Sequence, residues 1–114
     1  MEIKTEDYRI CYDQATATVI LQGALRLSGM DEYAPVVQLL NDVADSEPPK
    51  IVLNLQELEF LNSSGISMLS KFAIKVRQKG NVQMQIKGSQ SIPWQGKSLR
   101  NLLRLMPTLE LELK

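Results

Sequence analysis

Histidine is absent from the 114 residues, and cysteine occurs once, as Cys11. The absence of histidine excludes catalysis by a histidine acid or base, a Ser-His-Asp triad and a metal site with imidazole ligands. A single cysteine excludes an internal disulfide and a cysteine-rich zinc site. No uninterrupted apolar run approaches the roughly 20 residues of a membrane-spanning helix.

An excess of either charge is also absent, because Lys plus Arg and Asp plus Glu each number 13. This balance excludes binding to nucleic acid or to an anionic membrane through a net positive charge of the whole protein. The N-terminus carries Glu2, Glu6 and Asp7 in place of the basic start and apolar core of a secretory signal. We therefore expect a protein of the reducing cytoplasm that needs neither metal nor cofactor.

Charge is nevertheless distributed unevenly along the chain. Residues 1–57 contain 10 acidic and 4 basic side chains, a balance of −6, and residues 58–114 contain 3 acidic and 9 basic ones, a balance of +6. If elements of the two halves interleave in space, as is common in one small domain, the asymmetry averages out. If they do not, the protein has an acidic and a basic surface for protein partners.

Hydrophobic periodicity predicts a single α/β domain over residues 1–114, with its elements in the order β-β-α-β-α-β-α-β. Alternating βα units favour a mixed, mostly parallel β-sheet covered by helices, with an antiparallel hairpin at its start. The expected strands are residues 8–12, 16–25, 50–55, 82–87 and 109–113, and the expected helices are residues 31–47, 64–79 and 97–106. The last strand should form a sheet edge, since its outward residues are charged.

The most informative stretch joins the strand at residues 50–55 to the next helix and reads L-N-S-S-G-I at the junction. Asn62, Ser63 and Ser64 are side chains that cap a helix by accepting from its free N–H groups, and Gly65 is conformationally permissive. One interpretation is a helix cap alone. The other is a regulatory site, because a helix N-terminus favours anions and a serine there accepts a phosphate without melting the helix.

The pattern I-V-L-N-L-x-x-L-x-F-L-N-S-S-G-I, followed by a helix ending in K-G and a strand, resembles the STAS domains. The bacterial anti-sigma factor antagonists are closest in size and layout, and the resemblance extends from V-I-L-Q-G-A-L to L-R-N-L-L-R-L and the closing strand. It implies a non-enzymatic switch. A serine kinase that is also the anti-sigma factor phosphorylates a serine at the start of the second helix, and a PP2C-type phosphatase removes the phosphate. The unphosphorylated form binds the kinase and frees its other client.

In the family motif D-S-S-G the phosphate acceptor is the first serine, which corresponds to Ser63, with Ser64 as the second choice. The resemblance implies a partner-binding surface at the junction and at the loop after the second strand. Its expected residues are Asn62, Ser63, Ser64, Gly65, Arg26 and Ser28.

Three positions depart from the family pattern. Asn62 replaces the usual acidic residue, Glu59 stands where a small residue is frequent, and Arg26 reverses the charge of the family's G-x-L-D. Asn62 and Glu59 favour an alternative, a constitutive STAS adaptor in a lipid-transport ABC complex or a stressosome-like particle. Binding of a small molecule or nucleotide ranks last, because no glycine-rich phosphate loop is present.

Two features near the C-terminus each allow two interpretations. Trp94 either is an interaction hot spot or folds back onto the sheet edge or the last helix, and we favour the second. Lys97, Arg100 and Arg104 form either a solvated basic face, which we favour, or a docking site for an acidic partner. Nucleic-acid binding would need accompanying aromatic residues. We expect a monomer without membrane insertion, since heptads are absent.

No catalytic residue is predicted. The carboxylate pairs Asp31–Glu32 and Glu57–Glu59 lack a base or nucleophile at a recognisable spacing. Glu57 and Glu59 are expected to leave the end of their strand and face solvent.

Overall fold

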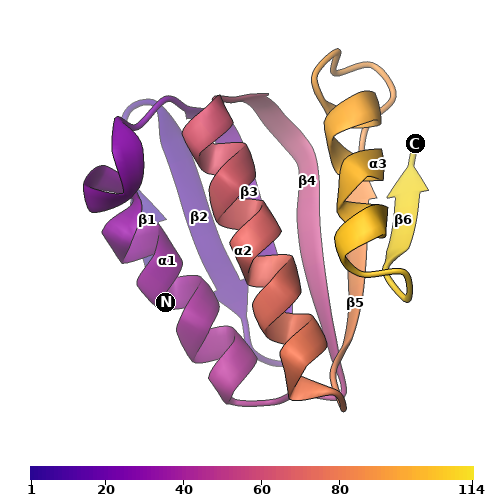
Figure 1. Cartoon of the computed structure of the whole chain (residues 1–114). Helices are drawn as coiled ribbons and strands as arrows, with labels where there is room; N and C mark the ends of the chain where they lie inside the picture. Colours follow the sequence, from indigo (N-terminus) through magenta and orange to yellow (C-terminus); the bar gives the residue numbers. More distant parts are fainter.

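The computed structural model describes residues 1–114 as one six-stranded sheet with three helices (Figure 1). The strands are β1 (Glu2–Lys4), β2 (Tyr8–Asp13), β3 (Thr18–Leu25), β4 (Lys50–Leu61), β5 (Gln83–Gly88) and β6 (Glu110–Leu113). The helices are α1 (Gly29–Asp45), α2 (Ser63–Lys79) and α3 (Gln95–Leu105).

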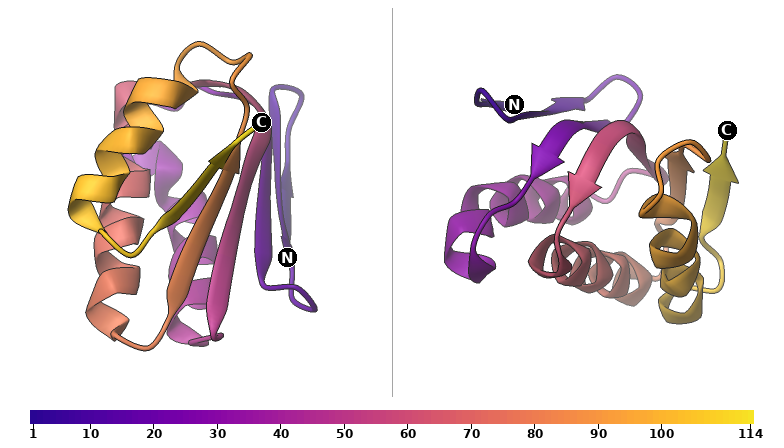
Figure 2. Two further views of the ribbon diagram at one scale, coloured as in Figure 1. Left: turned by 90° about the vertical axis from the view of Figure 1, so that its right-hand side faces the viewer. Right: turned by 90° about the horizontal axis from the view of Figure 1, so that it is seen from above.

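Every strand pairs with its neighbour in sequence, since the sheet order is β1-β2-β3-β4-β5-β6. The first three strands are antiparallel, and β3 to β6 are parallel. Right-handed crossovers that always advance in one direction place their helices on the same face of the sheet. Figure 2 shows all three helices on one face. The predicted mixed sheet, with β6 at an edge, is confirmed.

The core lies between the sheet and the helices and contains 27 buried hydrophobic residues. In β4 the residues Ile51, Leu53 and Leu55 point toward the helices and are fully buried, whereas the residues between them are only partly buried. This alternation arises because only one face of the sheet is covered. None of the three helices is long and apolar enough to cross a membrane.

The structure differs from the predicted elements by up to two residues at most ends, and by more in two places. The three-residue β1, too short to show an alternating pattern, pairs with β2 ahead of the predicted elements. β4 continues to Leu61, six residues beyond the predicted end at Leu55. Its register with β3 shifts between Ile20 and Gln22 and again after Gly23, so two bulges interrupt the expected alternation. Glu57 and Glu59 therefore lie within the strand, although both are exposed as expected.

Chain order across the sheet also decides between the two interpretations of the uneven charge. β1 to β3 and α1 lie on one side of β4, and β5, α3 and β6 lie on the other (Figure 1). The acidic and basic halves of the sequence are therefore neighbours in space and do not interleave. The interpretation that the elements interleave is therefore wrong, although Asp45 pairs with Lys75 and Lys79, and Lys50 with Glu110, across the boundary between the halves.

Candidate functional site

Asn62 caps α2, as the sequence predicts. It follows the last residue of β4 in an extended conformation, with φ −81° and ψ 177°. Its Oδ1 accepts a hydrogen bond of 2.9 Å from the backbone N–H of Gly65, and its own N–H donates to the carbonyl of Leu25 at 3.3 Å. The junction is therefore attached both to α2 and to the end of β3.

The Asn62 amide also binds two further groups. Its Nδ2 donates to the carbonyl of Leu27 at 2.8 Å, and its Oδ1 accepts from the Tyr33 hydroxyl at 2.8 Å. An aspartate could accept from Tyr33 and Gly65 but could not donate to Leu27. The neutral amide in place of the family's acidic residue thus has a structural role in this chain.

Tyr33 is fully buried on α1, and burial raises the pKa of its hydroxyl above the ordinary value. The hydroxyl therefore stays protonated and able to donate near neutral pH. The Leu25 carbonyl lies 3.3 Å away as a second acceptor. A buried tyrosine normally needs such partners, because an unpaired hydroxyl in the core is costly.

A glycine is required at position 65 because its neighbours leave no room for a side chain. A Cβ at this position would overlap the side chain of Leu61 and approach the Tyr33 hydroxyl to 2.7 Å. The glycine therefore allows the first turn of α2 to pack directly on the end of β4 and on α1. Its place in the junction is a requirement of close packing, beyond the backbone freedom that the sequence suggests.

Ser63 and Ser64 are the first two residues of α2. Ser63 is exposed and Ser64 is half-buried. The Asn62 side chain occupies the N–H of Gly65, and the Asn62 carbonyl accepts from Ile66 at 2.9 Å. The N–H groups of Ser63 and Ser64 precede these bonds and have no partner within the helix, so they are available to solvent or an anion.

The loop expected to bind a partner lies beside this junction. Arg26 and Ser28 are both exposed, and the Arg26 guanidinium lies 4.7 Å from the centroid of the Phe60 ring. Ser28 precedes α1, where its N–H donates to Oε1 of Glu32 at 3.0 Å and its side chain makes no capping bond. The structure thus brings together all six predicted site residues at one end of the sheet; their partner-binding role remains a prediction.

Residues 34–93 match the family model of the STAS domain, which is more than half of the chain. The chain belongs to the STAS domain family. No curated protein matches this STAS domain in sequence.

Solved structures of similar fold include two from Pseudomonas aeruginosa. A chain in the complex of diguanylate cyclase SiaD with its activator SiaC has a TM-score of 0.73 at 13% identity, covering 100% of this STAS domain and 99% of that chain. Apo-SiaC has a TM-score of 0.73 at 10% identity, with 100% and 98% covered. An anti-sigma factor antagonist from Mycobacterium paratuberculosis has a TM-score of 0.60 at 18% identity, with 96% and 82% covered. At these identities the likeness shows a shared fold.

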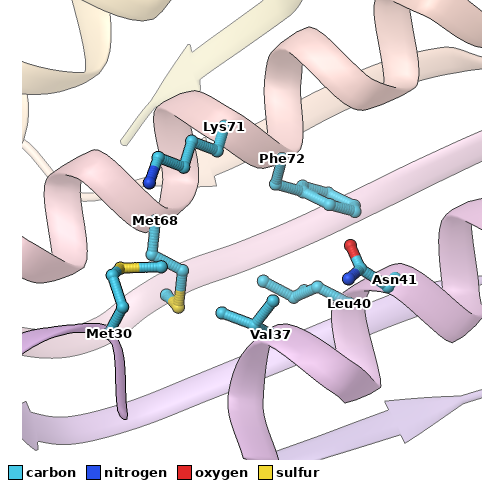
Figure 3. A pocket seen from close by; sticks show the side chains of 7 residues that line it. All are labelled: Met30, Val37, Leu40, Asn41, Met68, Lys71 and Phe72. Atoms are coloured by element: carbon cyan, nitrogen blue, oxygen red, sulfur yellow. The ribbon is translucent and has the colours of Figure 1, made fainter. Parts of the chain in front are cut away.

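A small groove between α1 and α2 opens near the junction of the STAS domain (Figure 3). Met30 and Met68 point toward one another at one end, and Lys71 extends over the same end. The volume of about 60 Å³ is far below the several hundred Å³ of a typical ligand pocket. The groove therefore does not support the nucleotide-binding alternative.

Gln95 is a structural residue that sequence reasoning missed. It is completely buried, and its Nε2 donates to the carbonyls of Leu55 and Leu58 at 2.6 and 3.0 Å. Its Oε1 accepts from the N–H of Ser89 at 2.7 Å. These hydrogen bonds hold the irregular part of β4 in place, where the regular hydrogen bonds to the neighbouring strands are interrupted. No sequence signal marks this role, because glutamine is usually exposed.

Trp94 folds back against the same segment. Its indole N–H donates to the Leu58 carbonyl at 3.0 Å, and the side chain is half-buried against the core. The interpretation that it folds back is confirmed, although the hydrogen bond reaches the central strand β4 instead of a sheet edge. Trp94 is thus not free to act as an exposed hot spot.

Proposed function

We propose that this STAS domain is a non-enzymatic partner-switch protein of the cytoplasm, controlled by phosphorylation of Ser63. It would act as a monomer that binds a serine kinase, which is also an anti-sigma factor, and a PP2C-type phosphatase would reset it. The observation that carries this proposal is the geometry of Ser63. Ser63 is exposed at the first position of a helix, whereas the residue before it is anchored by five hydrogen bonds.

A phosphate on Ser63 would leave the fold intact and change the surface. It adds about −1.5 to −2 charges at the positive end of the α2 dipole, beside the free N–H groups of Ser63 and Ser64. The hydrogen bonds that anchor the junction are made by the Asn62 side chain and do not involve the Ser63 side chain. Modification would therefore act chiefly on whichever protein docks over the junction.

Other exposed residues at the end of the sheet that carries Ser63 suit a protein partner. Phe60 and Met30 are each 38% exposed, which is unusual for large apolar side chains, and Arg26 covers the Phe60 ring. Aromatic, Met and Arg side chains are enriched at protein interfaces. Similarity to an anti-sigma factor antagonist and to SiaC, the activator of a diguanylate cyclase, supports regulation through binding of another protein.

A second candidate is a constitutive adaptor that needs no phosphate, as a subunit of a lipid-transport ABC complex or a stressosome-like particle. Asn62 favours it, because both the oxygen and the nitrogen of the amide that replaces the family's acidic residue bind groups inside the fold. In this case the Asn62 to Gly65 segment is only a helix cap and a rigid contact surface.

Phosphopeptide mass spectrometry of the protein from its native cell tests the switch directly. Phosphate on Ser63 is expected under at least one condition among growth, starvation and stress. The Ser63→Ala variant should retain the kinase in a pull-down, and Ser63→Asp should lose it. Ser67→Asp provides a matched control, because Ser67 is an exposed α2 residue outside the capped first turn. Equal kinase recovery by Ser63→Ala and Ser63→Asp would reject the switch in favour of the adaptor.

A further inference from the structure

The outer face of α3 carries a stripe of three exposed cations, Lys97, Arg100 and Arg104. Their spacing of i, i+3 and i+7 places them opposite the buried Leu99 and Leu102. None of the three takes part in an ion pair, and α3 contains no acidic residue. We call these three residues the α3 stripe.

The basic residues of α2 have different surroundings. Lys75 and Lys79 share one ion-pair partner, Asp45 of α1, at 3.2 and 2.9 Å, so their charge is partly compensated within the fold. Arg77 turns the other way, and its Nη1 donates to the Leu105 carbonyl at 3.1 Å, at the C-terminus of α3. Arg77 is exposed and places a fourth cation at the end of the α3 stripe.

The α3 stripe only partly suits its own helix, since Arg104 in the last turn complements the helix dipole but the other two cations do not. Lys97 lies in the first turn, where a positive charge opposes the helix dipole, and that turn contains no acidic residue. Like charges three or four residues apart also repel each other on a helix surface. The unfavourable position of Lys97 and the repulsion along the α3 stripe have no acidic partner within α3, which favours a role outside the fold.

The strand order prevents the acidic half from cancelling this charge. The half after residue 57 has a balance of +6, from 9 basic and 3 acidic side chains, and its helix α3 lies on the far side of β4 from β1, β2 and β3 of the acidic half. Charges separated by more than a Debye length of about 10 Å at 0.1 M salt are largely screened from one another. We infer that the α3 stripe, extended by Arg77, docks an acidic helix of a partner protein.

The surrounding residues favour a protein over a nucleic acid or a membrane. An 11-residue helix is only about 16 Å long, and a longer polyanion would run onto the acidic half of the molecule. Stacking of bases would need a free aromatic ring, but the nearest indole, Trp94, is bonded to Leu58 and half-buried. Leu99 and Leu102 face the core, so α3 has no apolar face to insert into lipid. Carboxylates at i, i+3 and i+7 of a facing helix match the α3 stripe.

This inference goes beyond the proposed switch, because the α3 stripe and Ser63 lie on different helices and can be tested separately. The probe is a 15-residue helical peptide with Glu at i, i+3 and i+7, titrated into the 15N-labelled full chain and followed by backbone amide shifts. In 20 mM NaCl we expect saturable shifts confined to α3 and Arg77, with affinity several-fold weaker at 150 mM NaCl. A peptide with Gln in place of Glu should not bind.

Two variants, each with one positive charge reversed, test whether the α3 stripe is the binding site. Arg100→Glu should weaken peptide binding at least fivefold, whereas Lys4→Glu, the same charge change at an exposed site on the acidic side, should change it less than twofold. The inference is overturned by shifts centred on α1 or the sheet, by equal binding of the Gln peptide, or by unchanged binding of Arg100→Glu. It is also overturned if a 12-base-pair DNA duplex or phosphatidylserine vesicles bind more tightly than the Glu peptide.

Discussion

The Tyr33 hydroxyl donates a hydrogen bond of 2.8 Å to Oδ1 of Asn62, 29 positions later in the sequence. The same oxygen accepts from the N–H of Gly65 in the first turn of α2. The start of α2 is therefore positioned by a side chain of α1. Ser63 lies on a surface that two packed helices hold in place, which suits a site that must present one fixed shape to a partner.

Tyr33→Phe should remove a pH dependence as well as a hydrogen bond. At pH 7 we expect the free energy of unfolding to fall by about 1 kcal/mol. Burial raises the folded pKa of Tyr33 above the ordinary value of 10.0, so the folded protein resists an ionisation that the unfolded chain undergoes. The stabilisation is complete below pH 10 and is lost as pH rises through the folded pKa. Urea unfolding between pH 8 and 11 should show a steeper decline for the wild type than for the variant, since the raised pKa of Lys79 contributes a decline to both proteins. Parallel curves would contradict this account.

Asn62→Asp, which restores the family's acidic residue, should destabilise this chain. The carboxylate keeps its bonds from Tyr33 and Gly65 but leaves the Leu27 carbonyl without its donor, at a cost of about 1–3 kcal/mol. The helix dipole offsets about 0.3–1 kcal/mol of this loss. We expect a net decrease of about 1 kcal/mol in urea unfolding at pH 7. Asn101→Asp, an exposed site on α3, serves as the control and should change stability by less than about 0.5 kcal/mol.

Gly65→Ala should be strongly destabilising despite alanine's higher helix propensity. The new methyl group would overlap Leu61 and crowd the Tyr33 hydroxyl. Overpacking of this kind costs about 1–3 kcal/mol. Gly96→Ala is the matched control, since the only neighbour near a Cβ there is the Arg100 guanidinium at 3.7 Å. Its melting temperature should stay the same or rise, and a Gly65→Ala protein as stable as Gly96→Ala would refute the packing argument.

Gln95→Leu should destabilise the protein at the irregular part of β4. The substitution leaves the Leu55 carbonyl and the Ser89 N–H without their buried partners, while Trp94 still donates to Leu58. We expect a loss of about 3 kcal/mol in unfolding free energy and faster amide exchange at Ser89. Gln78→Leu, at an exposed site of α2, should change stability by less than about 0.5 kcal/mol. Similar losses in both variants would rule out the proposed role of Gln95.

Periodicity and capping chemistry predict the parts of this protein that follow regular rules. The βα units and the Asn62 cap follow from local pattern, and both are present. The limits of β4 could not be predicted, because two bulges break the alternation after Leu55 and only tertiary partners satisfy that backbone. The Tyr33 bond likewise joins residues far apart in sequence, so no local window contains it.

The uneven charge shows a different limit of sequence reasoning. Its magnitude is evident from composition, but its meaning depends on topology. In a sheet whose strand order departs from chain order, the same residues would be mixed and their charges would cancel. Here the order β1 to β6 keeps the halves apart, so the basic helix α3 remains a distinct surface.

The sheet order also determines how the chain can fold. Each strand pairs only with its sequence neighbour, so the longest connection closed before a pairing is a single helical crossover. The entropic cost of loop closure is therefore small at every step, and each βα unit can add to the edge of the sheet already formed. During synthesis the N-terminal strands leave the ribosome first, and the later strands follow in the same order as in the sheet. The sheet can therefore grow during synthesis without waiting for a distant segment.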